Sequence, residues 1–125
     1  MASVLECCMV RVTIRIDLSD EDAVGPGKIR LLELIRETGS ISAAGRAMDM
    51  SYRRAWLLVE ELNRLFRKKV ATTKLGGRAG GGAALTPFGE SLIRHYRDME
   101  KDAHRAVARH LAALGAAARP VRRAV

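Results

Sequence analysis

A serine, a tyrosine and two arginines stand together at Ser51, Tyr52, Arg53 and Arg54, where a helical pattern of apolar residues begins. Hydroxyl and guanidinium groups bind phosphate oxygens and the edges of nucleic-acid bases. Two arginines in the first turn also oppose the helix dipole, which favours anions at that end. The placement therefore indicates an anionic partner, and duplex DNA is the partner that we expect.

The preceding residues predict a short helix and a tight turn that position this group. Gly39 can cap the end of one helix, and Ser40 can cap the start of the next, which is rich in alanine and glycine. Asp49-Met50 then forms a turn, and Ser51 caps a third helix. An ordinary packed helix pair would contain the same caps and small residues. The two arginines and a basic hairpin directly behind them favour a helix-turn-helix whose second helix enters the DNA major groove.

The hairpin behind this helix is predicted to span residues 70–86 and to form a wing. Residues 70–75 are typical of a strand, 76–82 form a glycine-rich loop, and Ala83 begins a return strand. No Gly-Lys-Ser/Thr follows the glycines, and no helix follows them directly, so a nucleotide cradle is not indicated. We expect Lys74 and Arg78 to contact phosphates or to enter the minor groove.

The flanking segments predict a small domain of residues 1–86. Residues 9–18 alternate apolar and polar side chains, as a half-buried strand does. The third helix has a buried stripe at helical spacing, and Trp56 is expected in the core, whereas Tyr52 could be buried or free to meet a phosphate. The stripe consists of Ala55, Leu58, Val59, Leu62 and Phe66.

A long helix is predicted over residues 87–114, capped by Thr86 with Pro87 at its first position. It would run for about 42 Å, which exceeds what the small domain needs. Apolar residues recur along it at spacings of four and three, which favours a symmetric partner helix over one that folds back on its own domain. The predicted dimer seam consists of Leu92, Tyr96, Met99, Ala103, Ala106 and His110. Residues 115–125 are expected to form a flexible tail.

The composition is that of a globular, basic protein. The 125 residues carry a net charge of +8, and residues 51–80 alone hold eight basic and two acidic side chains. There is no apolar run of membrane-spanning length and no signal-peptide pattern, so we expect a cytoplasmic protein with no membrane partner. Of Cys7 and Cys8, one is expected to be a small buried hydrophobic residue and the other to have no role. No catalytic constellation, metal-binding pattern or cofactor motif is present, so an enzyme is not indicated.

Several short motifs resemble the N-terminal DNA-binding domain of the ModE family of molybdate-responsive regulators, which is related to the winged helix of LysR-type regulators. The resemblance covers residues 27–105. The motifs are Ser40-Ile41-Ser42, Met50-Ser51-Tyr52, Ala55-Trp56, Glu61-Leu62-Asn63, Gly76-Gly77, Gly80-Gly81-Gly82-Ala83, Leu85-Thr86 and Gly89.

The resemblance implies a mainly α winged helix-turn-helix with a small β hairpin, which dimerises through its long C-terminal helix and binds a palindromic operator. The residues expected to contact DNA are Ser42, Ser51, Tyr52, Arg53, Arg54, Lys74 and Arg78. Full-length family members also carry C-terminal molybdate-binding domains, which this sequence lacks. We therefore expect a transcriptional regulator of molybdenum-related genes. It would regulate without sensing molybdate, depend on a separate partner that senses it, or respond to another effector.

Two other functions are consistent with the sequence. The first is a protein-interaction accessory module in molybdenum handling that does not act on DNA, and salt-dependent binding to duplex DNA would argue against it. The second is a small enzyme or metal-binding protein that uses Cys7, Cys8 and the histidines, which metal analysis would test.

Overall fold

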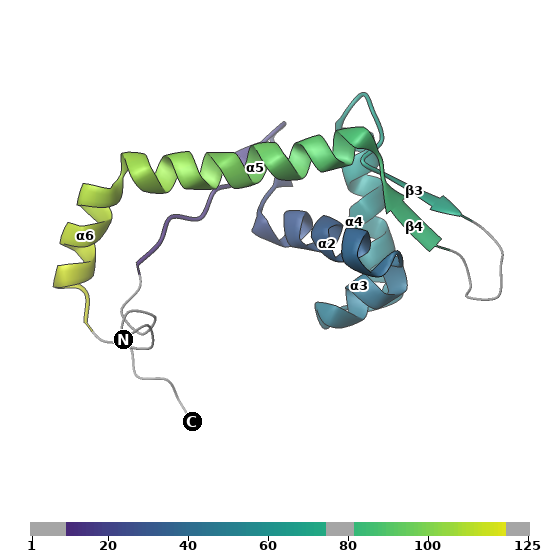
Figure 1. The fold of residues 1–125 in the computed structure, drawn as a ribbon, viewed down its shortest axis with the longest axis horizontal. Helices are drawn as coiled ribbons and strands as arrows, with labels where there is room; N and C mark the ends of the chain where they lie inside the picture. The colour runs from purple at the N-terminus through teal and green to yellow at the C-terminus, as the bar shows by residue number, and fades with distance from the viewer. Residues whose placement is uncertain (1–9, 75–81, 120–125) are drawn as a thin grey trace.

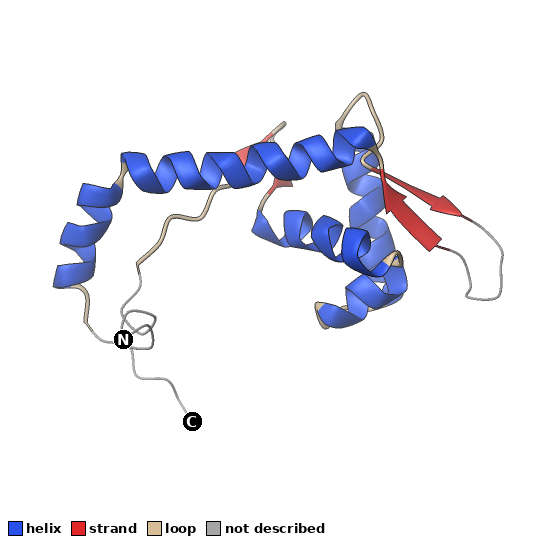
Figure 2. Ribbon diagram, in the orientation of Figure 1, coloured by secondary structure: helices blue, strands red, loops and turns tan. Residues whose placement is uncertain are grey.

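The computed structural model describes residues 10–74 and 82–119 and is mainly helical, with two small antiparallel strand pairs (Figures 1 and 2). This arrangement confirms the predicted fold class and is that of a winged helix-turn-helix. In chain order the elements are β1 (Ile16–Asp17), β2 (Ala23–Val24), α2 (Pro26–Thr38), α3 (Ile41–Ala47), α4 (Tyr52–Leu65), β3 (Ala71–Lys74), β4 (Gly82–Leu85), α5 (Pro87–Ala106) and α6 (Ala108–Ala117).

The helix ends lie where the predicted caps place them. Ser40, Ser51 and Thr86 precede α3, α4 and α5, and each hydroxyl accepts a hydrogen bond of 3.0–3.1 Å from the backbone N–H three residues later. Gly39 ends α2 in the left-handed conformation, with φ of 71°, and its N–H donates to the carbonyl of Ile35. These bonds satisfy backbone groups that the helices leave unpaired, so the boundaries follow from local sequence.

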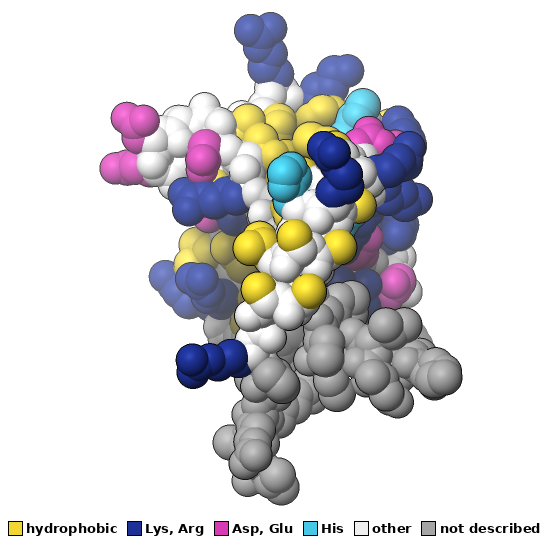
Figure 3. Space-filling view, turned by 90° about the vertical axis from the view of Figure 1, so that its left-hand side faces the viewer, with side chains coloured by type: hydrophobic (Ala, Val, Ile, Leu, Met, Phe, Trp, Pro, Cys, Tyr) yellow, Lys and Arg dark blue, Asp and Glu magenta, His cyan; other side chains and the backbone are white. Residues whose placement is uncertain are grey.

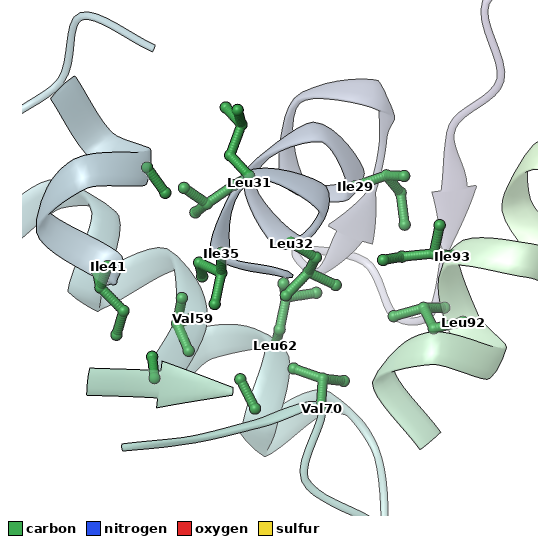
Figure 4. Packing of buried hydrophobic residues seen from close by; sticks show 14 of the residues in the cluster. Ile29, Leu31, Leu32, Ile35, Ile41, Val59, Leu62, Val70, Leu92 and Ile93 are labelled. Carbon is green, nitrogen blue, oxygen red and sulfur yellow. The ribbon is translucent and has the colours of Figure 1, made fainter. Parts of the chain in front are cut away.

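The hydrophobic core lies where α2 meets α4, α5 and the hairpin (Figure 4). Helix α2 is the central element, because it packs against α3, α4, α5 and β4, and its residues Ile29, Leu32 and Ile35 are fully buried. The predicted stripe of α4 is confirmed at its centre, although Leu58 and Phe66 are only partly buried. The other buried residues of the core are Val24, Leu31, Leu34, Ile41, Ala44, Ala55, Val59, Leu62, Val70, Ala71, Ala83, Leu92, Ile93 and Tyr96.

The predicted hairpin is present as β3 and β4, with Ala71 opposite Leu85 and Lys74 opposite Gly82. Its return strand is attached to the helices, because the N–H of Ala83 donates to the carbonyl of Gly39 at the end of α2. The tip of the hairpin, including Arg78, lies outside the described residues, as do Cys7 and Cys8.

The strand predicted over residues 9–18 is wrong for most of its length, because only Ile16–Asp17 forms a strand. The alternation itself is present, with inward and outward side chains alternating from Val10 to Asp17. Alternation indicates two faces but not a hydrogen-bonding partner, and this segment lies along a helix instead of a strand (Figure 1). The hydroxyl of Tyr96 donates to the carbonyl of Ile14 at 2.7 Å, and the N–H of Val12 donates to His104 Nε2 at 3.4 Å.

The single helix predicted over residues 87–114 is also wrong, because the chain breaks helical geometry at Val107 and turns into α6 (Figure 1). Val107 has φ of −107° and ψ of 14°, and it is only partly buried, beyond Tyr96, the last residue of the core along this helix. A β-branched residue disfavours a helix interior, which assists the break. The predicted tail is helical up to Ala117, and residues 120–125 lie outside the described part.

Trp56 does not belong to the core, contrary to the prediction. Its side chain is 38% exposed on α4, on the flank next to the buried stripe. An apolar side chain beside a buried stripe is covered only if another element overlies it, and the sequence does not show which element would. Within the described residues, no helix is both long and apolar enough to cross a membrane.

Candidate nucleic-acid interface

Helices α3 and α4 pack against each other and are joined by a tight turn. Asp49 occupies the turn with φ of 56°, and the N–H of Met50 donates to the carbonyl of Gly45 at 2.9 Å. A Cβ at Gly45 would lie 3.1 Å from the Cβ of Ala55, so glycine allows the two helices to approach closely. The predicted turn at Asp49-Met50 is confirmed.

The first turn of α4 presents its polar groups to solvent. Tyr52 is 56% exposed, and Ser51, Arg53 and Arg54 are exposed as well. No ion pair among the described residues involves either arginine. Two exposed guanidinium groups beside the positive end of a helix raise the local potential and favour an anionic partner.

Ion pairs are unevenly distributed along the described part of the chain. Several basic residues of α2 and α5 pair with carboxylates, as Arg36 does with Glu90 at 2.9 Å and Arg97 with Glu33 at 2.7 Å, although Arg94 and Lys101 of α5 have no such partner among the described residues. Between residues 42 and 74, no basic side chain has a carboxylate partner in the part of the chain that the structure describes. These side chains are Arg46, Arg53, Arg54, Arg64, Arg67, Lys68, Lys69 and Lys74.

Asn63 connects α4 to the hairpin, and the sequence analysis gave it no role. Its side-chain amide donates to the carbonyl of Ala71 at 3.2 Å, and its Oδ1 accepts from the N–H of Val70 at 2.8 Å. An amide in the last turns of a helix is suited to this role, because it offers a donor and an acceptor together. Asn63 thereby fixes the position of β3, with the exposed Lys74 at its end, relative to α4.

The remaining predicted site residues are less closely grouped. Ser42 lies in the first turn of α3 and is half-buried, and its Oγ accepts a hydrogen bond from Arg46 Nη1 at 3.0 Å. The pair places a guanidinium group on the surface of the first helix of the helix-turn-helix. Arg78 was expected beside Lys74 and lies outside the described residues.

Trp56, Tyr52 and Arg53 line an open hollow of about 240 Å³ on α4. The sequence analysis placed Trp56 in the core and therefore missed it as a surface residue. The signal available was its offset of one position from the buried residue Ala55, which turns it about 100° away from the stripe around the helix.

The predicted dimer seam is only partly available for a partner. Leu92 and Tyr96 are buried inside the protomer, which corrects their assignment, because the first half of α5 packs on the protein's own core. Met99 is 38% exposed, and Ala103, Ala106 and His110 are partly or fully exposed beyond the core.

Helix α5 is held on α2 by a group of ion pairs. Arg97 donates from Nε and Nη2 to the two carboxylate oxygens of Glu33 at 3.0 and 2.7 Å, and from Nη1 to Glu100 at 2.8 Å. The hydrogen bonds from Arg97 hold the pKa of Glu33 below its usual value, and burial raises it by a smaller amount. The same carboxylates raise the pKa of Arg97, so both groups stay charged.

The structure offers no alternative centre for metal chemistry within residues 10–74 and 82–119, where no group of three or more histidine, cysteine, aspartate or glutamate side chains could hold a metal ion. Cys7 and Cys8, on which the alternative metal-binding interpretation depends, lie outside these ranges.

Comparison with known proteins identifies relatives of one kind, although no protein-family profile matches the chain. The chain is 48% identical over 77 residues to the molybdenum-pterin-binding protein MopB of Rhodobacter capsulatus, a match that covers 62% of this chain and 28% of MopB. It is 34% identical over 85 residues to the DNA-binding transcriptional dual regulator ModE of Escherichia coli, covering 68% of this chain and 32% of that protein.

A third relative extends the match slightly. The transcriptional regulator ModE of Haemophilus influenzae is 32% identical over 90 residues, which is 72% of this chain and 35% of the relative. The chain thus matches about a third of the length of these proteins, in their N-terminal region. The chain is therefore a relative of the ModE and Mop proteins and carries a ModE-like N-terminal domain.

Proposed function

We propose that this protein is a sequence-specific DNA-binding regulator of transcription. The observation that carries the proposal is the pair of exposed arginines Arg53 and Arg54 at the start of the second helix of a helix-turn-helix, neither of which has a carboxylate partner among residues 10–74 and 82–119. The wing beside it supports the proposal, as does the similarity to proteins that are named transcriptional regulators. A regulator of this kind acts on DNA in the cytoplasm.

The arrangement suits the DNA major groove. The first turn of α4 would enter the groove, where the guanidinium groups of Arg53 and Arg54 can each donate two hydrogen bonds to O6 and N7 of a guanine. The hydroxyl groups of Ser51 and Tyr52 would donate to phosphates at the edges of the groove. Lys74 on the wing would contact a phosphate of the neighbouring backbone and add affinity without reading sequence.

We further propose that two copies bind a palindromic site. Helix α5 extends beyond the core, and α6 has no buried residue. Hydrophobic side chains gather on the end of the molecule that α6 forms (Figure 3), and Leu114 there is 62% exposed. A second copy would cover this surface together with Met99, and its two-fold symmetry would require two half-sites about one helical turn apart.

The regulated genes are proposed to be connected with molybdenum, because the relatives are named as ModE and Mop proteins. The proposal concerns the DNA-binding domain, and it leaves open whether an effector acts through another protein or on this chain. Molybdate is therefore included in the experiment below.

Selection of bound duplexes from a random-sequence pool is the experiment that tests the proposal. The purified protein should enrich a palindromic motif, and it should bind the selected duplex far more tightly than a shuffled duplex in a fluorescence anisotropy titration at fixed salt. The double variant Arg53→Ala/Arg54→Ala should lose this preference. Arg94→Ala is the control, because Arg94 is also exposed and has no ion pair among the described residues, but lies on α5.

Failure to enrich any motif, together with equal affinity for selected and shuffled duplexes, would contradict the proposal. In that case the accessory role in molybdenum handling would be the better interpretation. Titrations with and without molybdate in the same buffer show whether that anion changes the affinity for DNA.

A further inference from the structure

Helix α4 carries three exposed apolar or aromatic side chains in its first half. Tyr52 is 56% exposed, Trp56 is 38% exposed and Leu57 is 44% exposed. These side chains lie beside Arg53 and Arg54, which have no carboxylate partner among the described residues, and a surface that only attracts phosphate needs no large apolar side chains. The patch therefore needs an explanation beyond charge.

Tyr52 and Trp56 lie on one flank of α4. They are four residues apart, and Asn63, seven residues after Trp56, lies on the same flank and bonds to β3. Their side chains, with that of Arg53, line the hollow of about 240 Å³. Leu57, in contrast, lies about 100° further round the helix and does not line the hollow.

The surroundings of the hollow determine what can occupy it. Arg53 lines it, Arg54 is next to it in sequence, and neither has an ion-pair partner within the described ranges. The occupant should therefore be anionic overall and yet present a small apolar group. In duplex DNA the major groove contains one such group, which is the C5-methyl of thymine.

We propose that Trp56 and Tyr52 form an apolar contact for thymine methyl groups, so that this protein reads thymine next to the bases bonded by its arginines. The inference rests on the proposed DNA binding and adds a substrate feature to it. Arginine recognises guanine through hydrogen bonds, whereas the aromatic pair distinguishes thymine from cytosine by the burial of a methyl group.

Replacement of thymine by uracil isolates this contact, because it removes the methyl group and leaves every hydrogen-bonding group of the base in place. Each duplex has uracil at a single position of the half-site, and the equivalent position of the other half-site is changed with it. We expect roughly fourfold weaker binding per methyl at one or two positions of each half-site, which corresponds to the burial of one methyl group. Other thymines should show no effect.

The variant Trp56→Ala should bind the thymine and uracil duplexes with equal affinity. Trp56→Phe, which keeps a ring, should retain part of the difference. Leu57→Ala is the matched comparison, because it truncates an exposed apolar side chain at the next position and should keep the full difference. Thermal unfolding followed by circular dichroism confirms that each variant is folded at the assay temperature.

A second readout needs no variant, because Trp56 is the one tryptophan of the chain. Its fluorescence emission should move to shorter wavelength on binding of the thymine duplex, since the indole loses contact with water. The movement should be smaller with the uracil duplex at the sensitive positions.

Three outcomes would overturn the inference while DNA binding itself stands. They are equal affinity of the wild type for thymine and uracil at every position, an unchanged difference in Trp56→Ala, and loss of the difference in Leu57→Ala instead. A protein that enriches no duplex at all would contradict the proposed function, and the inference would fall with it.

Discussion

At the scale of single residues, the proposed interface combines side chains that act on DNA in different ways. A guanidinium group is a planar fork that matches two acceptors on one base, whereas an ammonium group is a point charge without such geometry. Arg53 and Arg54 stand where bases can be reached, and Lys74 stands at the end of β3, on the wing. Substitution of the arginines should therefore change base preference, whereas substitution of the lysine should change the affinity for all duplexes.

Arg53→Ala and Arg54→Ala should each weaken binding to the selected duplex and flatten base preference at one or two positions. Loss of a bidentate contact to guanine removes about 1–3 kcal/mol of discrimination. Titration against a panel of single-base changes in the duplex measures the effect. Unchanged preference in both variants would remove α4 from base recognition.

Lys74→Ala should weaken binding to selected and shuffled duplexes by the same factor. If Lys74 neutralises one phosphate, the slope of log affinity against log salt concentration should become less steep by about 1. Arg94→Ala, which removes the same charge from α5, should leave the slope unaltered. A slope that Lys74→Ala does not change would show that the hairpin stays clear of the DNA.

At the scale of secondary-structure elements, close contacts between backbones position the hairpin and α5. A Cβ at Gly89 would lie 2.1 Å from the carbonyl oxygen of Val70, which also accepts a hydrogen bond from the N–H of Thr86. The first turn of α5 can therefore approach the base of β3 only with glycine at this position. This is a requirement for space and not for an unusual backbone angle.

Gly89→Ala should consequently destabilise the protein, by about 1–3 kcal/mol, because the backbone of Val70 must move. Gly27→Ala is the matched control in the first turn of α2, where an added Cβ meets nothing within 4 Å. It should be neutral or stabilise the protein by up to about 1 kcal/mol. Urea denaturation of both variants measures the difference, and equal stabilities would contradict the packing argument.

The attachment of α5 to α2 should depend on acid. The pKa of Glu33 is lower in the folded protein than its usual value of 4.5, because Arg97 donates hydrogen bonds to the ionised carboxylate. The ionised form therefore stabilises the fold above about pH 4.5, and this contribution is lost as the pH falls through the lower, folded pKa. Glu33→Gln should be less stable at neutral pH and should lose less stability on acidification.

Urea denaturation between pH 7 and pH 3 tests this expectation. Glu37→Gln is the control on the same helix, because Glu37 is exposed and lies 3.7 Å from Arg30, so its loss should change little. Equal acid dependence in wild type and Glu33→Gln would show that another group controls the acid response.

What the sequence could predict depends on whether the cause is local. The starts of α3, α4 and α5 follow from Ser40, Ser51 and Thr86, whose hydroxyl groups bond to the backbone three residues away. The break at Val107 has no such marker, since neither glycine nor proline is there. It depends on where the core ends, which is a property of the assembled fold.

The same distinction applies to the candidate site. The polar start of α4 was predictable, because charge against the helix dipole is visible in four consecutive residues. The exposure of Trp56 and the role of Asn63 were not, because both depend on where the hairpin lies relative to α4. Tyr96 shows the opposite error, because it was expected at the surface of a dimer seam and is buried in the core. The same helical spacing of apolar residues is consistent with either position.

At the scale of the whole molecule, the extension of α5 and α6 beyond the core is the feature that the proposed dimer explains. Met99→Glu should produce monomers, because the new charge would be buried against a second copy at a cost of several kcal/mol. Tight binding to the palindromic duplex should be lost with it, since one half-site provides only part of the contacts.

Sedimentation and DNA titration of the same preparations test the dimer. Lys101→Gln is the control, because it changes the net charge by the same one unit at an exposed position about 200° around the helix from Met99. A dimer that persists in Met99→Glu would exclude this part of α5 from the interface.

The extended segment of residues 10–15 has a consequence for DNA as well as for the fold. Residues 12 and 14 bond to His104 and Tyr96 on α5 and thereby attach α5 to the chain that continues into β1. Strand β1 pairs with β2, and β2 leads into the first turn of α2. Helix α5 is thereby joined to the helix-turn-helix in two ways, by the ion pair of Arg97 with Glu33 on α2 and by its bonds to residues 10–15, and both attachments restrict its rotation. In the proposed dimer, the gap between the two recognition helices would then be set by the folded chain, and the duplex would be the partner that bends to meet it.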